Sequence, residues 1–162
     1  MATQTALERA GRLAPPGSFA IPSMLNCLVL SWSEQRAQLL QSVAVDEAWQ
    51  AKVCGDVQEF LRSVFQLDVP LTVVDLPRKG TASYAELREI ATQTHGVNRS
   101  LLVVCGASTG GDPDEEQWAR ELGAWAYLPG ATDASGLRLV FAEARKALAK
   151  QSTAYVEANG YR

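Results

Sequence analysis

Asp75 is the residue of this chain best placed to do chemistry. It closes the apolar run from Leu71 to Val74. A continuous apolar run predicts a strand that helices bury on both faces, as in a parallel sheet. Ligands of such sheets gather at the carboxyl ends of the strands, so Asp75 lies where a reacting or binding group would be found.

The other chemically capable residues favour structural roles. His95, the only histidine, ends a helical pattern, where an imidazole complements the helix dipole. The glycine-rich stretch 106–111 lacks the Lys-Ser/Thr of a phosphate-binding loop and is followed by four acids within residues 112–116, so it predicts a turn and a helix cap. We therefore expect no catalytic residue, no cofactor and no enzymatic activity.

The three cysteines, Cys27, Cys54 and Cys105, each stand in or beside a strand-like run, and none forms a C-x-x-C pair. Free cysteine behaves as a small hydrophobic residue that is commonly buried. This placement favours core thiols over a metal or redox site. Unpaired thiols also fit a reducing compartment.

Composition limits the partners. The 162 residues carry a net charge of -3, so the surface as a whole does not attract nucleic acid or anionic lipid. No apolar stretch approaches the roughly 20 residues that span a bilayer. The first 13 residues have no apolar signal core, and we expect a cytoplasmic protein.

Five strand-like runs alternate with five helical patterns. The strands are expected at 25–31, 51–54, 71–75, 101–105 and 125–128, and the helices at 33–49, from 56 past 65, from about 84 to 96, at 112–123 and at 133–150. Such alternation implies right-handed crossovers and a parallel sheet. We predict an α/β, flavodoxin-like three-layer sandwich of strand order 2-1-3-4-5. Residues 1–23 form an extension, 24–150 the domain and 151–162 a frayed tail.

Residues 25–150 resemble a response-regulator receiver (CheY-like) domain. The resemblance is carried by the run PLTVVDLP around Asp75, by VCGAS at 104–108 and by GAWAYL at 123–128. In that family the third-strand aspartate accepts a phosphoryl group. An acidic pair after the first strand holds magnesium, a Thr or Ser after the fourth contacts the phosphate, and a lysine after the fifth pairs with it.

The resemblance makes Asp75 the phosphoacceptor position, and the other groups are missing. No carboxylate stands at residues 30–32, where the acidic pair belongs. Gly106 takes the Thr/Ser position, with Ser108 two residues later, and Gly130 takes the lysine position. Lys79 is a remote candidate for a replacement cation. One carboxylate holds a hard cation poorly, so we expect a degenerate receiver, or pseudo-receiver, without a metal.

Four aromatic residues lie near the expected rim or beside the last strand. Trp32 follows the first strand, and we favour a ring that fills the vacated acidic pocket over a partner anchor. Tyr127 aligns with the receiver aromatic that changes between inward and outward rotamers. With Trp118 and Trp125 it marks the fourth helix, fifth strand and fifth helix as the interaction surface.

These observations favour a signalling or adaptor domain that binds another signalling protein, or a second copy of itself, without phosphorylation. One alternative is a module that binds a small molecule or nucleotide, or a weak enzyme, that uses the rim with Asp75, Ser108 and Thr109. An open pocket that Trp32 does not fill would indicate it. The other alternative is a receiver still phosphorylated on Asp75.

Overall fold

Five parallel strands form one sheet in the order β2-β1-β3-β4-β5, as the sequence predicts. The computed structural model describes residues 25–95, 100–130 and 133–160. The strands are β1 (Leu25–Ser31), β2 (Trp49–Val53), β3 (Leu71–Asp75), β4 (Leu101–Cys105) and β5 (Ala126–Leu128). The helices are α1 (Glu34–Asp46), α2 (Val57–Gln66), α3 (Ala82–Thr94), α4 (Pro113–Leu122) and α5 (Ala134–Asn159).

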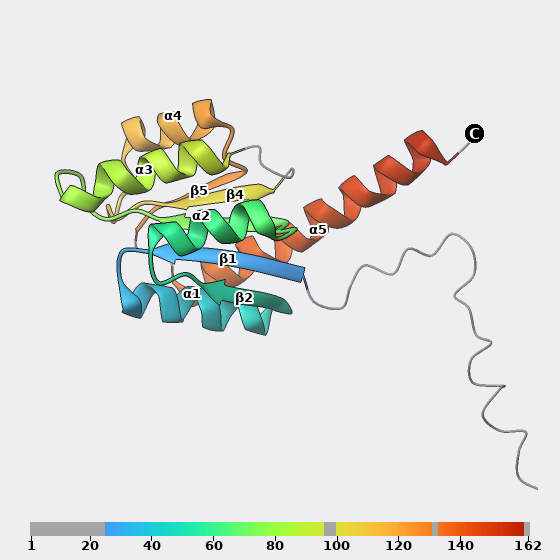
Figure 1. Cartoon of the computed structure of the whole chain (residues 1–162), viewed down its shortest axis with the longest axis horizontal. Coiled ribbons are helices and arrows are strands. Elements are labelled where there is room, and N and C mark those ends of the chain that lie inside the picture. The colour runs from blue at the N-terminus through green and yellow to red at the C-terminus, as the bar shows by residue number, and fades with distance from the viewer. Residues whose placement is uncertain (1–24, 96–99, 131–132, 161–162) are drawn as a thin grey trace, which may run out of the picture.

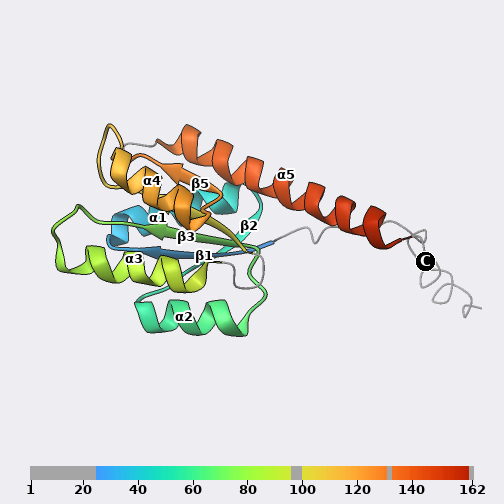
Figure 2. The same ribbon diagram turned by 90° about the horizontal axis from the view of Figure 1, so that it is seen from above.

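Helices cover both faces of the sheet (Figures 1 and 2), and the strands alternate between the two resulting cores. On β3, Val74 packs toward α2, α3 and α4, whereas its neighbour Val73 packs toward α1 and α5. Every residue of β3 and of β4 is buried. This two-sided burial explains why both strands are apolar throughout in the sequence. The flavodoxin-like three-layer sandwich is confirmed.

Side-chain caps begin four of the five helices. Ser33, Asp56, Asp112 and Asp133 each accept a hydrogen bond from a backbone N–H of the first turn. Asp112 is followed by Pro113 at the first helical position, and α4 stops at Gly123, whose φ of 90° favours glycine. These caps fix where each helix leaves the carboxyl rim of the sheet.

The boundary between α1 and β2 differs from the prediction. We expected the helix to reach Trp49 and the strand to begin at Ala51, but α1 ends at Asp46 and β2 begins at Trp49. Ala48 turns the chain with a φ of 63°. Trp49 then enters the core fully buried, and its indole N–H donates to the Phe141 carbonyl at 3.1 Å. Burying the indole and pairing its N–H stabilise a strand that begins at Trp49, so α1 ends before this residue.

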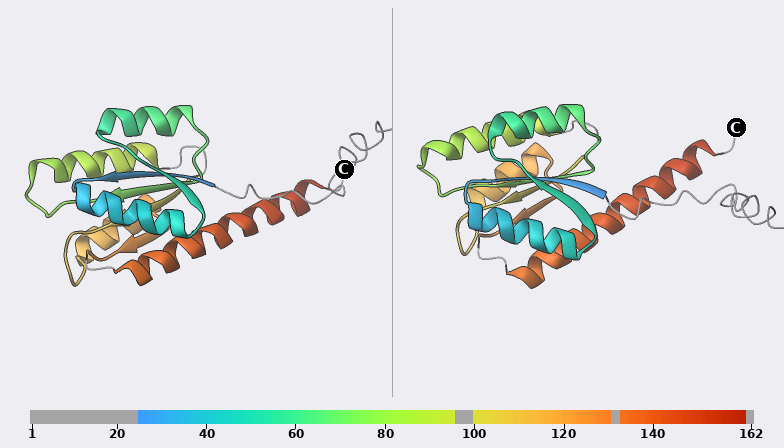
Figure 3. Two further views of the ribbon diagram at one scale, coloured as in Figure 1. Left: turned by 90° about the horizontal axis from the view of Figure 1, so that it is seen from below. Right: turned by 60° about the horizontal axis from the view of Figure 1, so that its bottom comes forward.

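The predicted frayed tail is wrong for most of its length, because α5 continues past residue 150 to Asn159. No proline or glycine interrupts the stretch 137–159, which is rich in good helix formers. The end of α5 projects beyond the sheet (Figures 1 and 3), and all of its residues from 150 on are exposed.

Along the described residues, no helix is both long and apolar enough to cross a membrane.

Candidate functional site

Asp75 lies at the carboxyl end of β3 and is only 1% exposed. Two side chains of the protein contact its carboxylate. The strand register places Ser31 of β1 directly beside it. The Ser31 hydroxyl donates to Asp75 Oδ2 at 2.6 Å, and Arg36 of α1 brings its Nε to 3.5 Å from the same oxygen. One carboxylate oxygen is therefore bound by a hydroxyl and faces a guanidinium.

These contacts correct two expectations. Trp32 does not fill the vacated acidic pocket, since its side chain is 52% exposed. Lys79 is not the replacement cation, because its amine pairs with Asp112 at 2.5 Å and Asp114 at 4.0 Å. The cation beside Asp75 is Arg36, which reaches the rim from the first turn of α1.

Burial dominates the electrostatics of Asp75. Desolvation raises the pKa of its carboxyl above the ordinary value, and the Ser31 hydrogen bond and the Arg36 charge oppose this rise. On the other side of Asp75, burial raises the pKa of the Cys105 thiol to about 12, with a further rise from Asp75 and an opposing effect of Arg36. All three cysteines are buried and free, as predicted.

A second buried carboxylate, Glu115 of α4, lies near this rim with 4% exposure. Tyr84 of α3 donates its hydroxyl to Glu115 Oε2 at 2.7 Å, and Tyr127 of β5 donates to Oε1 at 2.8 Å. Burial first, and the Glu115 hydrogen bond second, raise the pKa of both phenols. One carboxylate thus joins three elements of the fold.

The two glycines at the expected phosphate-contacting positions are closely surrounded. A side chain at Gly106 would overlap the Glu115 carboxylate and the Tyr127 hydroxyl. A side chain at Gly130 would overlap the backbone of Ala107, and the Gly130 N–H donates to the Ser108 carbonyl at 2.9 Å. Neither position could take the side chain of the receiver pattern without a shift of these neighbours.

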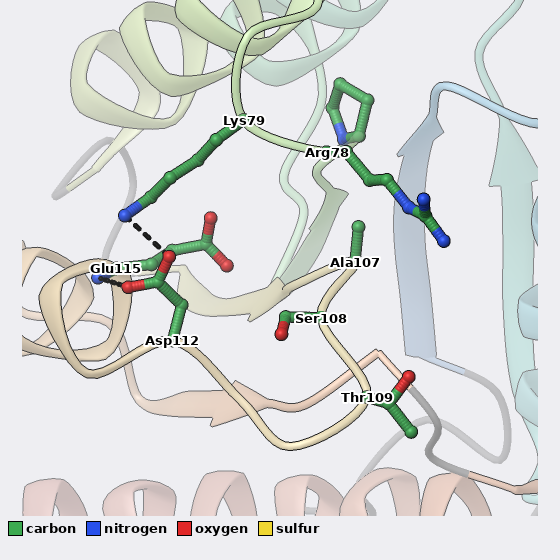
Figure 4. Close-up of a pocket in the computed structure, with 8 residues that line it drawn as sticks. Arg78, Lys79, Ala107, Ser108, Thr109, Asp112 and Glu115 are labelled. Atoms are coloured by element: carbon green, nitrogen blue, oxygen red, sulfur yellow. Dashed lines mark hydrogen bonds and ion pairs between the residues drawn. The ribbon is translucent and has the colours of Figure 1, made fainter.

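A pocket of about 330 Å³ opens between the loop after β3 and the loop after β4. Its lining comprises Pro77, Arg78, Lys79, Ala107, Ser108, Thr109, Asp112 and Glu115. Figure 4 shows Lys79 directed to Asp112, while the Arg78 guanidinium extends the opposite way. Two of the three residues expected for a ligand-binding rim, Ser108 and Thr109, line the pocket, and the buried Asp75 does not.

The three aromatic residues of the predicted interaction surface differ in how far they are buried. Tyr127 and Trp118 are partly buried against the core. The Arg88 guanidinium lies 4.3 Å from the Trp118 ring centroid, a cation–π contact. Trp125, at 37% exposure, presents the most accessible of the three rings.

The residues present fit magnesium poorly. The cation needs several oxygen ligands, and Asp75 has one of its two oxygens bound by Ser31 beside a positive charge. Within the described ranges there is no group of three or more His, Cys, Asp or Glu residues placed to hold a metal.

Sequence reasoning missed Ser31, Arg36, Tyr84 and Glu115 as site residues. A signal existed for Ser31, because the predicted strand order makes β1 the neighbour of β3. Glu115 shares an i, i+3, i+4, i+7 stripe with Trp118, Ala119 and Leu122, so its position on the apolar face of α4 was readable. Arg36 gave no comparable signal.

Comparisons with known proteins identify the fold. No family model and no curated protein matches the sequence. The signal receiver domain of a putative Luxo repressor protein from Vibrio parahaemolyticus matches with a TM-score of 0.65 and 16% identity, over 81% of this chain and 97% of that one. A CheY-like receiver domain protein from Methanospirillum hungatei JF-1 matches with a TM-score of 0.61 and 13% identity, over 76% and 98%.

NtrX from Brucella abortus, solved in complex with ADP, matches with a TM-score of 0.66 and 15% identity, over 85% of this chain and 30% of that one. The chain therefore has the fold of response-regulator receiver domains. At such identities the likeness concerns the fold, so function has to be argued from the rim residues themselves.

Replacing Ser31 with alanine tests the site. The hydroxyl stabilises ionised Asp75, so Ser31→Ala should raise the pKa of Asp75 further, and the shift of its carboxyl carbon during a pH titration by NMR measures this. We expect the free energy of unfolding at neutral pH to fall by about 1–3 kcal/mol. The exposed Ser108→Ala control should change it by less than about 0.5 kcal/mol.

The sign of the pH dependence follows from the raised pKa. Folded Asp75 holds its proton more tightly than unfolded Asp75 does. Its contribution to the free energy of unfolding is therefore fully present below the unfolded pKa of about 3.8, and it is lost as the pH rises through the folded pKa. In Ser31→Ala this loss should extend to higher pH. An unchanged Asp75 titration would contradict the assigned hydrogen bond.

Proposed function

We propose that this chain is a receiver-like signalling or adaptor domain that acts by protein–protein contact in the cytoplasm, without magnesium-dependent phosphorylation and without enzymatic activity. The observation that carries the proposal is the state of Asp75, whose Oδ2 accepts from Ser31 and faces Arg36. One oxygen of Asp75 is thus already occupied by a hydroxyl beside a positive charge, which leaves it less able to hold a divalent cation.

The chemistry of phosphoryl transfer supports this proposal. A carboxylate attacks a phosphoryl group only when a cation cancels the repulsion between the two negative charges. The buried Glu115, beside Gly106, adds negative charge where a receiver has a neutral hydroxyl. Asp75 has almost no exposed surface for a phosphodonor to reach.

Treatment with acetyl phosphate, or with beryllofluoride, in the presence of Mg²⁺ tests the proposal. We expect no phosphoryl adduct by intact-protein mass spectrometry and no change in the NMR signals of the rim, and a typical receiver treated in parallel serves as the positive control. An adduct that forms on the wild type and is absent from Asp75→Asn would establish the alternative, a receiver phosphorylated on Asp75.

The surface formed by α4, β5 and α5 is the proposed contact with another signalling protein or with a second copy of the chain. Trp125 immediately precedes β5 and is 37% exposed, and Leu139 of α5 is 62% exposed. Large aromatic side chains are enriched among the residues that dominate binding energy. We propose a homodimer as the first form of this contact.

Sedimentation velocity over a range of protein concentrations measures the dimer. Trp125→Asp should raise the dimer dissociation constant by about tenfold or more, because a charge would replace a large aromatic ring within the contact. Phe65→Asp is the matched control, since Phe65 is 60% exposed on α2, outside the surface. Equal effects of the two substitutions, or a wild type that stays monomeric, would argue against this dimer.

A second candidate function, binding of a small molecule or nucleotide at the rim, is favoured by the pocket beside Ser108 and Thr109 and by the outward position of Trp32. The pocket volume lies at the low end of the range for ligand sites. Its lining balances two cations, Arg78 and Lys79, against two acids, Asp112 and Glu115, which weakens its attraction for phosphates.

Thermal unfolding with added ligand separates the two functions. Ligands that bind only the folded state raise the Tm with concentration. We expect ATP, ADP, GTP and FMN to leave it unchanged. A saturable rise in Tm that is lost in Arg78→Ala would favour the ligand-binding function.

A further inference from the structure

Glu115 occupies an unusual position for a carboxylate. It lies on the apolar side of α4, one turn before the buried Ala119, at 4% exposure. A buried charge is costly unless hydrogen bonds satisfy it. The hydroxyls of Tyr84 and Tyr127 donate to its two oxygens at 2.7 and 2.8 Å, and they come from different elements.

The position of Tyr127 depends on this carboxylate. With its hydroxyl on Glu115 Oε1, the ring lies inward, against the core formed with α2, α3 and α4. An outward ring would leave Glu115 with one of these two donors and would vacate the part of the space beside Gly106 that the Tyr127 hydroxyl now fills. Both consequences oppose the outward rotamer.

The start of α4 is held at a second point. Lys79, in the loop after β3, pairs with Asp112, the N-cap of α4. Glu115 stands three residues further along the same helix. The loop after β3, α3 and β5 therefore all contact the first turn of α4.

We propose that Glu115 is a built-in acceptor that holds Tyr127 inward and fixes α4, α3 and β5 in one arrangement, so that the α4–β5 part of the interaction surface needs no incoming signal to form. A side-chain carboxylate of the chain itself thus does the positioning. The use of this surface for a partner rests on the proposed function, whereas the hydrogen bonds of Glu115 stand independently of it.

Replacing Glu115 with leucine removes both acceptor oxygens at similar size. Photo-CIDNP NMR detects tyrosine rings whose hydroxyl is accessible to solvent, and Tyr155, at 62% exposure, is an internal reference in each spectrum. We expect a weak Tyr127 signal in the wild type and a several-fold stronger one in Glu115→Leu. Glu115→Gln, which keeps the shape and one oxygen, should keep the signal weak.

Glu121→Leu is the matched control, because Glu121 is an exposed acid of the same helix whose carboxylate accepts a hydrogen bond from the Gln117 side chain. It should leave the Tyr127 signal as in the wild type. A Tyr127 signal that stays weak in folded Glu115→Leu would overturn the inference. The proposed function would survive that result, since it is tested by the phosphodonor and the dimer.

A double-mutant cycle decides the case if Glu115→Leu does not fold. Tyr84→Phe and Tyr127→Phe each remove one donor, and only their combination leaves the buried carboxylate with neither. The second substitution should therefore lower the folding equilibrium constant by about tenfold more in the presence of the first than alone. Additive effects would overturn the inference.

Discussion

A carboxylate buried at the end of a strand must be neutralised, and this constraint organises the carboxyl rim of the sheet. Asp75 is surrounded by apolar strands, so water cannot stabilise its charge. The chain supplies Ser31 through the strand register and Arg36 through the first turn of α1. The desolvation that raises the pKa of Asp75 is thereby partly offset within the fold.

The same constraint acts a second time at Glu115, with a different solution. No cation is paired with its carboxylate among the contacts of the described chain, and two phenol hydroxyls satisfy it instead. Because these donors come from α3 and β5, satisfying the charge also fixes the relative positions of three elements. The hydrogen bonds that satisfy Glu115 therefore also determine how α3, α4 and β5 pack together at the rim.

The sequence predicts what depends on periodicity and on strand ends. The strand order, the apolar runs Leu71–Val74 and Leu101–Val104 and the caps Asp56 and Asp112 all follow from local patterns. The contacts of Arg36 did not, because a long side chain in a first helical turn has many possible partners. Trp32 was misplaced for the related reason that nothing in its neighbourhood reveals that Arg36 reaches the same space. The end of α1 was misjudged because tertiary burial of Trp49 overrides helix propensity.

Asp75 and Glu115 together determine which internal contacts an incoming ligand would disturb. A ligand shifts a structure only by as much as its affinity differs between two states. At this rim, a divalent cation that used Asp75 Oδ2 would have to displace the Ser31 hydroxyl and the Arg36 guanidinium, and an anionic phosphoryl group would approach a second buried carboxylate at Glu115. Losing the internal contacts of Asp75, or adding charge repulsion at Glu115, reduces the net gain from binding. A rim whose carboxylates are hydrogen-bonded within the fold favours one arrangement of α4 and β5.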